Sequence, residues 1–91
     1  MAEAEESGDE PRLGESLVRL VGLVVDEPQE VVLEEATDDA GDRVYTVLVD
    51  YEDLGKVIGR QGRTARALRA FLDVRGDLDG QRYELEISER N

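Results

Sequence analysis

The sequence has no cysteine, no histidine and no tryptophan, and its aromatic residues are three tyrosines and one phenylalanine. Without cysteine there is no disulfide framework and no thiolate nucleophile, and without histidine the commonest general base and metal ligand is missing. Its serines would have no histidine to activate them, and the phosphate-binding pattern G-x-x-x-x-G-K-[ST] is absent. We therefore expect no catalytic site, no cofactor and no metal centre.

Long hydrophobic runs are also missing. The longest ones, such as residues 23–25 and 47–49, are far shorter than the roughly 18 residues that a membrane-spanning helix needs. The N-terminal segment is acidic where a signal peptide would be basic. We expect a soluble cytoplasmic protein whose 91 residues form one domain, with a core too small to enclose a deep substrate cavity.

Positive charge is scarce and concentrated in one segment. The chain has 11 lysines and arginines against 23 aspartates and glutamates, for a net charge of −12. Residues 54–72 nevertheless contain no carboxylate and hold five cations, which we call the basic segment: Lys56, Arg60, Arg63, Arg66 and Arg69. A basic segment within an acidic chain indicates a polyanionic ligand more specifically than uniform basic charge would.

Residues 1–12 contain five carboxylates and almost no large apolar side chain. This composition predicts a disordered acidic tail that mainly keeps the protein soluble. A second hypothesis is that the tail competes for the basic segment as a weak electrostatic gate, since a flexible dozen residues spans roughly 20 Å.

Hydrophobic periodicity predicts a helix that begins at Leu13 and ends near Asp26, just before Pro28. The apolar stripe of this helix consists of Leu13, Leu17, Leu20, Val21 and Val24.

Two segments rich in β-branched residues, 31–36 and 44–49, predict strands separated by a turn-forming loop at residues 37–42. The second strand is apolar on both faces, so we expect helices on one face and other contacts on the opposite face. The three aspartates of the loop could indicate a cation site. Because their order does not match a Ca²⁺ loop, we favour a solvated loop.

The basic segment predicts two helices joined at a tight corner. Asp50 can cap the first helix and Asp53 favours its first turn by charge, whereas Gly59 must end it. A second helix is predicted from about Arg63 to Asp73, with Ala65, Leu68 and Leu72 on its inner side and the arginines on its outer side. A turn-rich loop at residues 75–80 and a strand at residues 82–88 complete the order αββααβ.

The corner, Gly59-Arg60-Gln61-Gly62, has features suited to a phosphate group. Its glycines allow close approach of the backbone, and the amides at the start of the following helix carry the positive end of the helix dipole. The corner is surrounded by four cations, Lys56, Arg60, Arg63 and Arg66. Just before it, Val57 and Ile58 offer an apolar surface to bases. Because a chain with this glycine content contains roughly one G-x-x-G pair by chance, the prediction of a phosphate-binding corner depends on the surrounding residues and not on the glycine pair itself. The alternative is an ordinary helical hairpin with solvated arginines.

Residues 55–69, GKVIGRQGRTARALR, closely resemble the signature of the KH domain, a VIGxxG corner followed by a helix. The order αββααβ matches the type II form of that fold, and DLGKVIG, GRTA and DEP resemble the bacterial KhpA family of single-KH-domain proteins. The resemblance covers about residues 13–87. It implies an α+β fold with a three-stranded sheet and helices packed on one face, as one KH domain over residues 13–88 followed by a C-terminal end at residues 89–91.

The resemblance further implies that the chain binds single-stranded RNA and is not an enzyme. The corner would clamp the backbone of about four nucleotides, with Arg60 and Gln61 facing the phosphates. The full set of implied RNA-binding residues is Lys56, Val57, Ile58, Gly59, Arg60, Gln61, Gly62, Arg63 and Arg66.

Members of the family are regarded as RNA chaperones or post-transcriptional regulators. The resemblance implies a homodimer or a heterodimer with a KhpB-type KH protein, no membrane partner, and in some bacteria an effect on cell-wall synthesis and cell shape. One departure is Ala65, where many KH domains have a larger aliphatic residue, which argues against strong sequence selectivity. An alternative reading is a protein-interaction module whose KH surface docks a partner protein.

Overall fold

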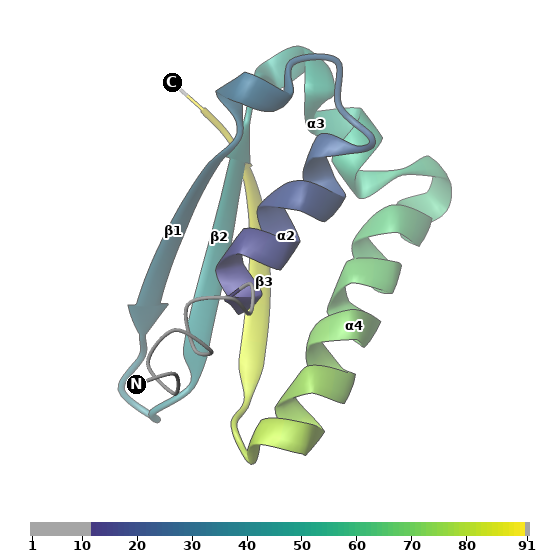
Figure 1. Cartoon of the computed structure of the whole chain (residues 1–91). Coiled ribbons are helices and arrows are strands. Elements are labelled where there is room, and N and C mark those ends of the chain that lie inside the picture. The colour runs from purple at the N-terminus through teal and green to yellow at the C-terminus, as the bar shows by residue number, and fades with distance from the viewer. Residues whose placement is uncertain (1–11, 91) are drawn as a thin grey trace, which may run out of the picture.

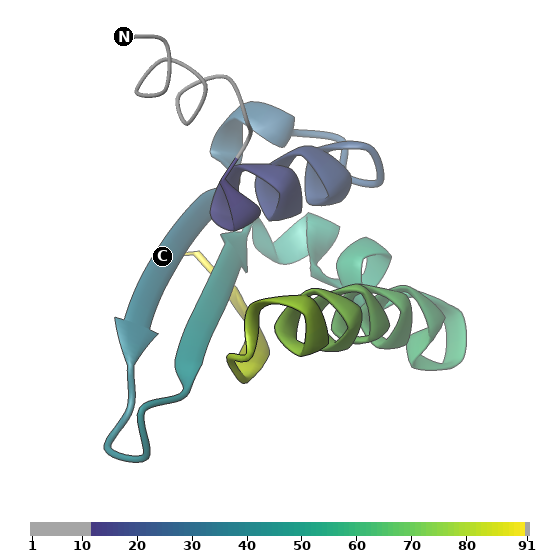
Figure 2. The ribbon, with the colours of Figure 1, turned by 60° about the horizontal axis from the view of Figure 1, so that its bottom comes forward.

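The computed structural model describes residues 12–90 and contains a three-stranded sheet with helices on one of its faces (Figures 1 and 2). In chain order the elements are α2 (Leu13–Gly22), η1 (Pro28–Glu30), β1 (Val32–Thr37), β2 (Arg43–Val49), α3 (Tyr51–Ile58), η2 (Arg60–Gly62), α4 (Arg63–Asp79) and β3 (Tyr83–Glu89). The central strand β2 pairs antiparallel with β1 and parallel with β3. The predicted order αββααβ and the fold class are confirmed.

The core lies between the sheet and the helices. Tyr45, Val47 and Val49 point from β2 into it, because alternate residues of a strand face opposite sides. The helices contribute buried side chains at helical spacing, namely Leu17, Val21, Val57, Leu68 and Leu72. On the opposite face of β2, Val44 and Leu48 are half-buried, and no helix within residues 12–90 covers them (Figure 2).

The helix α2 is shorter than we predicted. It ends at Gly22, four residues before the expected end, in a tight turn in which the amides of Leu23 and Val24 donate to Leu20 and Val21. The chain turns there because Val25 packs into the core. Leu20 and Val24, which we assigned to the buried stripe, are exposed, and Val24 lies beyond the end of the helix.

The helix α4 is longer than we predicted and ends at Asp79, so the expected loop at residues 75–80 is wrong. Gly76 does not end the helix. It is buried, and a Cβ atom at this position would clash with the backbone oxygen of Gln81, so glycine lets the start of β3 pack closely against α4. Gly80, with φ of 66°, ends the helix in the left-handed conformation.

Asp79 fastens the end of α4 to β3. It accepts hydrogen bonds from the Tyr83 hydroxyl at 2.6 Å and from Arg75 Nε at 3.0 Å. The hydrogen bond from Tyr83, and to a lesser extent that from Arg75, lowers the pKa of Asp79. The last turn of α4 is thus tied to the first residue of β3.

Within residues 12–90, no helix is both long enough and apolar enough to cross a membrane. The predicted acidic tail, apart from Arg12, lies outside the described residues.

Candidate functional site

The corner between α3 and α4 has the backbone that its two glycines allow. Gly59 ends α3 with φ of 82° and ψ of 166°, a conformation almost restricted to glycine. Gly62 and Gln61 both have positive φ, of 74° and 56°. The predicted break at Gly59 is confirmed, and the tight turn is closed by a hydrogen bond of 3.0 Å from the amide of Gly62 to the oxygen of Gly59.

The start of α4 faces this corner without a side-chain cap. Gly62 is its N-cap residue, and no side chain accepts a hydrogen bond from the first amides. The amide of Arg63 donates to the backbone oxygen of Arg60, and the amides that follow it, together with the positive end of the helix dipole, favour an anion. Because α4 has 17 residues, its dipole is fully developed at this end.

Three exposed arginines surround the corner. Among residues 12–90, no carboxylate lies within 4.0 Å of the charged group of Arg60, Arg63 or Arg66. Beside the corner, Arg63 Nη2 donates a hydrogen bond of 3.4 Å to Gln61 Oε1. Within the described residues, these three cations therefore have no neutralising partner.

The apolar surface beside the corner is smaller than we predicted. Val57 is fully buried in the core, so our expectation that its side chain faces bases is wrong, because α3 packs this position against the sheet. Ile58 is 40% exposed and keeps an apolar surface. Ala65 is also buried, so its small size affects the core and not the surface of the site.

A groove runs along the seam between α4 and β3, from Arg69 toward the end of α4 that is opposite to the corner. One hollow of about 310 Å³ is bounded by Arg69 and Leu85, and a second of about 400 Å³ extends toward Gly80. We call their union the α4–β3 groove, because both hollows are bounded by Leu72, Asp73, Arg82 and Tyr83.

Comparison with known proteins identifies the family. The family model described as KhpA/KhpB, KH domain, matches residues 15–87. The chain belongs to the KhpA/KhpB KH-domain family. The predicted resemblance is thus confirmed over most of the described residues.

Several bacterial relatives in the KhpA/KhpB family align along nearly their whole length. RNA-binding protein KhpA of Thermotoga maritima is 41% identical over 73 residues, which cover 80% of this chain and 92% of the relative. The protein of the same name from Listeria monocytogenes is 36% identical over 75 residues, covering 82% of this chain and 97% of the relative. RNA-binding protein KhpA of Streptomyces coelicolor is 48% identical over 64 residues, which cover 70% of this chain and 80% of the relative.

Two solved structures of Era have the same fold at low sequence identity. Aquifex aeolicus Era superposes with a TM-score of 0.57 at 18% identity, over 85% of this chain and 30% of the Era chain. Era in complex with nucleotides of 16S ribosomal RNA gives a TM-score of 0.55 at 18% identity, over 84% of this chain and 29% of the other. These similarities show that the KhpA/KhpB fold recurs as a part of a longer protein.

In this KhpA/KhpB-family domain, Lys56 is not an independent cation. Its Nζ lies 3.3 Å from Asp26 Oδ2 and 3.8 Å from Asp53 Oδ1. Two carboxylates therefore offset the charge that we had assigned to the phosphate site. The structure places Lys56 beside the corner as part of an ion-pair cluster.

The residue that sequence reasoning missed is Asp53. Only 2% of it is exposed, and its two carboxylate oxygens accept hydrogen bonds of 3.1 Å from the amides of Asp26 and Glu27. It therefore fastens the loop after α2 to the first turn of α3. Periodicity could not reveal this role, because the partners lie 26 and 27 positions earlier in the chain.

We expect the Asp53→Asn variant to lose about 2 kcal/mol of the free energy of unfolding, because one of the two backbone amides that donate to this buried side chain would lose its acceptor. Chemical denaturation of the variant and the wild type measures this loss. Glu52→Gln is the matched control, since it removes the same charge from an exposed neighbour and should change stability by less than about 0.5 kcal/mol. Equal stabilities for Asp53→Asn and Glu52→Gln would contradict the fastening role.

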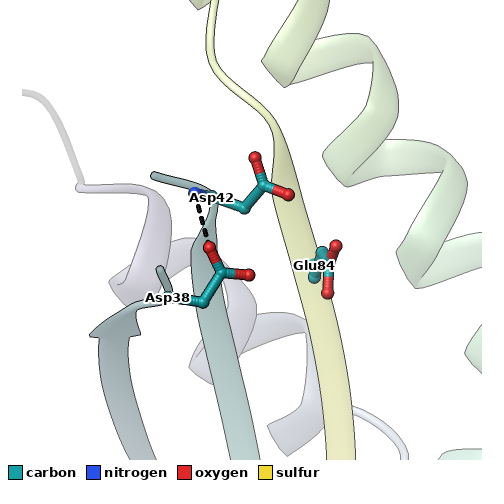
Figure 3. Close-up of side chains that lie close together, drawn as sticks. All are labelled: Asp38, Asp42 and Glu84. Atoms are coloured by element: carbon teal, nitrogen blue, oxygen red, sulfur yellow. Dashed lines mark hydrogen bonds between the residues drawn. The ribbon is translucent and has the colours of Figure 1, made fainter. Parts of the chain in front are cut away.

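Two carboxylates of the loop between β1 and β2, Asp38 and Asp42, lie beside Glu84 of β3 (Figure 3), and the three have oxygens within 4.8 Å of one another. Asp38 Oδ1 accepts hydrogen bonds from the amides of Ala40 and Asp42, which is the usual use of aspartate in a turn. Arg82 Nε lies 3.4 Å from Asp42 and 3.1 Å from Glu84. Turn formation and Arg82 thus account for the cluster, which includes Glu84 in place of the predicted Asp39.

Proposed function

We propose that this chain binds single-stranded RNA at the corner between α3 and α4. The observation that carries the proposal is the group of three arginines without carboxylate partners in the described residues, gathered at an uncapped helix start in a chain of net charge −12. A polyanion is the ligand that such a site stabilises. Relatives named RNA-binding protein KhpA support RNA as that polyanion.

In this proposal the RNA backbone lies on the corner and its bases enter the α4–β3 groove. Arg60 and Gln61 face the phosphates, while Arg63 and Arg66 flank them along α4. The chain has few aromatic residues, so stacking on an open platform contributes little, and a groove is the better fit. Asp73 and Glu84 border the groove, and their charge disfavours a phosphate there.

Salt dependence tests how many phosphates are neutralised. If three arginines each neutralise one phosphate, log K plotted against log salt concentration should have a slope of roughly −2 for a single strand. We expect Arg66→Ala to make this slope shallower by roughly 0.7 with little change in sequence preference. Fluorescence anisotropy of a labelled uridine octamer, titrated at four salt concentrations, measures the slope.

Lys56→Gln is the control for this experiment. Because Asp26 and Asp53 already offset the charge of Lys56, its removal should leave the slope nearly unchanged. A change as large as that of Arg66→Ala would show that Lys56 contacts phosphate directly.

An apolar stripe on α4 supports a second component of the proposal, pairing with another KH chain. Phe71, Val74 and Leu78 are 37%, 62% and 78% exposed, and their spacing places them on one side of the helix. Exposed apolar stripes of this kind favour protein partners. We propose a homodimer or a heterodimer with a KhpB-type protein, and co-purification with and without nuclease separates direct pairing from pairing through RNA.

The proposed physiological role is that of an RNA chaperone or post-transcriptional regulator, with an effect on cell-wall synthesis and cell shape. This role rests on the family resemblance alone, because no single residue of the site indicates it. Crosslinking in cells followed by RNA sequencing would identify the bound transcripts and so test it.

A further inference from the structure

Arg69 is held in a way that distinguishes it from the other cations of the basic segment. Its Nη2 donates a hydrogen bond of 3.3 Å to the backbone oxygen of Leu85 in β3. Within residues 12–90, no carboxylate lies within 4.0 Å of its charged group. The guanidinium is therefore fixed by a neutral acceptor and keeps its full charge.

The acceptor belongs to the open edge of the sheet. β3 is the last strand in the order β1-β2-β3 and pairs with β2 alone. The oxygen of Arg82 accepts a hydrogen bond from the amide of Arg43, so it faces β2. Because backbone groups alternate in direction along a strand, the oxygen of Leu85, three positions later, faces away from β2 and toward Arg69.

This hydrogen bond places Arg69 at the border of the α4–β3 groove, in the hollow that also contacts Leu72 and Leu85. Arg69 follows Arg66 by three positions on α4, so the two side chains are neighbours on the helix surface. A strand held at the corner and at Arg66 would therefore reach Arg69 next. Since Asp73 and Glu84 border the same hollow, a neutral base suits it better than a phosphate.

The chemistry of the anchored guanidinium selects among bases. Nη2 carries two hydrogens, and Leu85 accepts one of them. The other forms a two-donor edge with the hydrogen of Nε or of Nη1. Guanine presents two adjacent acceptors, O6 and N7, to such an edge, and in a single strand cytosine presents O2 and N3 on its Watson–Crick edge, whereas adenine and uracil offer no adjacent pair of acceptors.

We propose that Arg69 recognises a base with two adjacent acceptors, guanine through O6 and N7 or cytosine through O2 and N3, and so sets a sequence preference at one position of the bound strand. This inference rests on the proposed RNA binding at the corner. Recognition from α4 leaves the phosphate contacts of Arg60, Arg63 and Arg66 unchanged. Substitution of Arg69 should therefore change the base preference, whereas substitution of one of those three arginines should change the salt dependence.

The experiment measures, by fluorescence anisotropy, binding of the full chain to a uridine octamer and to two variants of it, one carrying a single guanine and one a single cytosine. We expect the wild type to bind one or both of the substituted octamers about tenfold more tightly than the uridine octamer, since a good bidentate pair discriminates by about 1–3 kcal/mol. Arg69→Lys keeps the charge but lacks the two-donor edge. It should reduce the preference to less than about twofold while leaving the affinity for the uridine octamer and its salt slope nearly unchanged.

Arg66→Lys is the matched control, because it makes the same exchange three positions earlier and should retain the base preference. Arg69→Gln is a second test, which should also lose the preference and leave the salt slope nearly unchanged, because Arg69 contacts a base and not a phosphate in this inference. Circular dichroism and thermal melting confirm that each variant is folded. A base preference that survives in both Arg69 variants overturns the inference.

Two further outcomes separate the inference from the proposed function. Binding of all three octamers with equal affinity by the wild type overturns base recognition by Arg69 and leaves RNA binding at the corner intact. No measurable binding of any of the octamers at low salt overturns the proposed RNA binding, and the inference with it.

Discussion

Replacing Arg60 and Gln61 together with aspartate should lower the affinity for a uridine octamer by roughly 100-fold at low salt, because two negative charges would face the phosphates. The fold should be retained. Both side chains are exposed, and aspartate tolerates the positive φ of Gln61 better than most residues do. Anisotropy titration measures the affinity, and circular dichroism with thermal melting checks the fold.

Arg19→Asp is the control for this charge reversal, because Arg19 is an exposed arginine of α2, outside the corner. It should weaken binding by less than about threefold through the overall field of the protein. If the doubly substituted corner bound RNA as tightly as the wild type while remaining folded, the corner would not be the binding site.

Gly59→Ala should cost about 3 kcal/mol of the free energy of unfolding, because it combines backbone strain with a steric clash. An added Cβ atom would lie 2.5 Å from Thr64 Oγ1 and 2.7 Å from the Thr64 amide nitrogen. The backbone at Gly59 has φ of 82°, which a residue with a Cβ atom rarely adopts. For a domain of this size, the expected fall in melting temperature is about 12–24 °C.

Gly55→Ala provides the opposite expectation within the same helix. Nothing lies within 4 Å of a Cβ atom added at Gly55, and alanine has a higher helix propensity than glycine, so the variant should gain about 0.5–1 kcal/mol. Differential scanning calorimetry of the two variants compares them directly. A loss at Gly55 equal to that at Gly59 would show that the corner imposes no special requirement for glycine.

The sequence was sufficient for features that depend on near neighbours. The element order and the break at Gly59 follow from periodicity and from glycine itself. The ends of α2 and α4 could not be predicted in this way, because tertiary contacts determine them. Packing of Val25 into the core ends α2, and the close approach of Gln81 explains why a glycine lies inside α4.

In the candidate site, too, the features that depend on near neighbours were predicted and those that depend on distant contacts were not. The exposure of Arg60, Arg63 and Arg66 follows from their position on the outer side of the corner, as the sequence predicted. The pairing of Lys56 with Asp26 spans 30 positions, so counting charges along the basic segment left it as an independent cation. The burial of Val57 was missed because α3 is short and turns that position toward the sheet.

The parallel pairing of β2 with β3 has a consequence for how the protein folds. Arg43 is paired with Tyr83, so the two strands are joined through a connection of more than 30 residues that contains α3, the corner and α4. Parallel strands need such a crossover, and closing it is a slow, non-local step in folding. The corner lies inside this connection, and β3 can dock only when α3 and α4 have turned back toward the sheet. A substitution that weakens the β2–β3 ladder would therefore slow the assembly of the proposed RNA site without changing any residue that we propose to contact RNA.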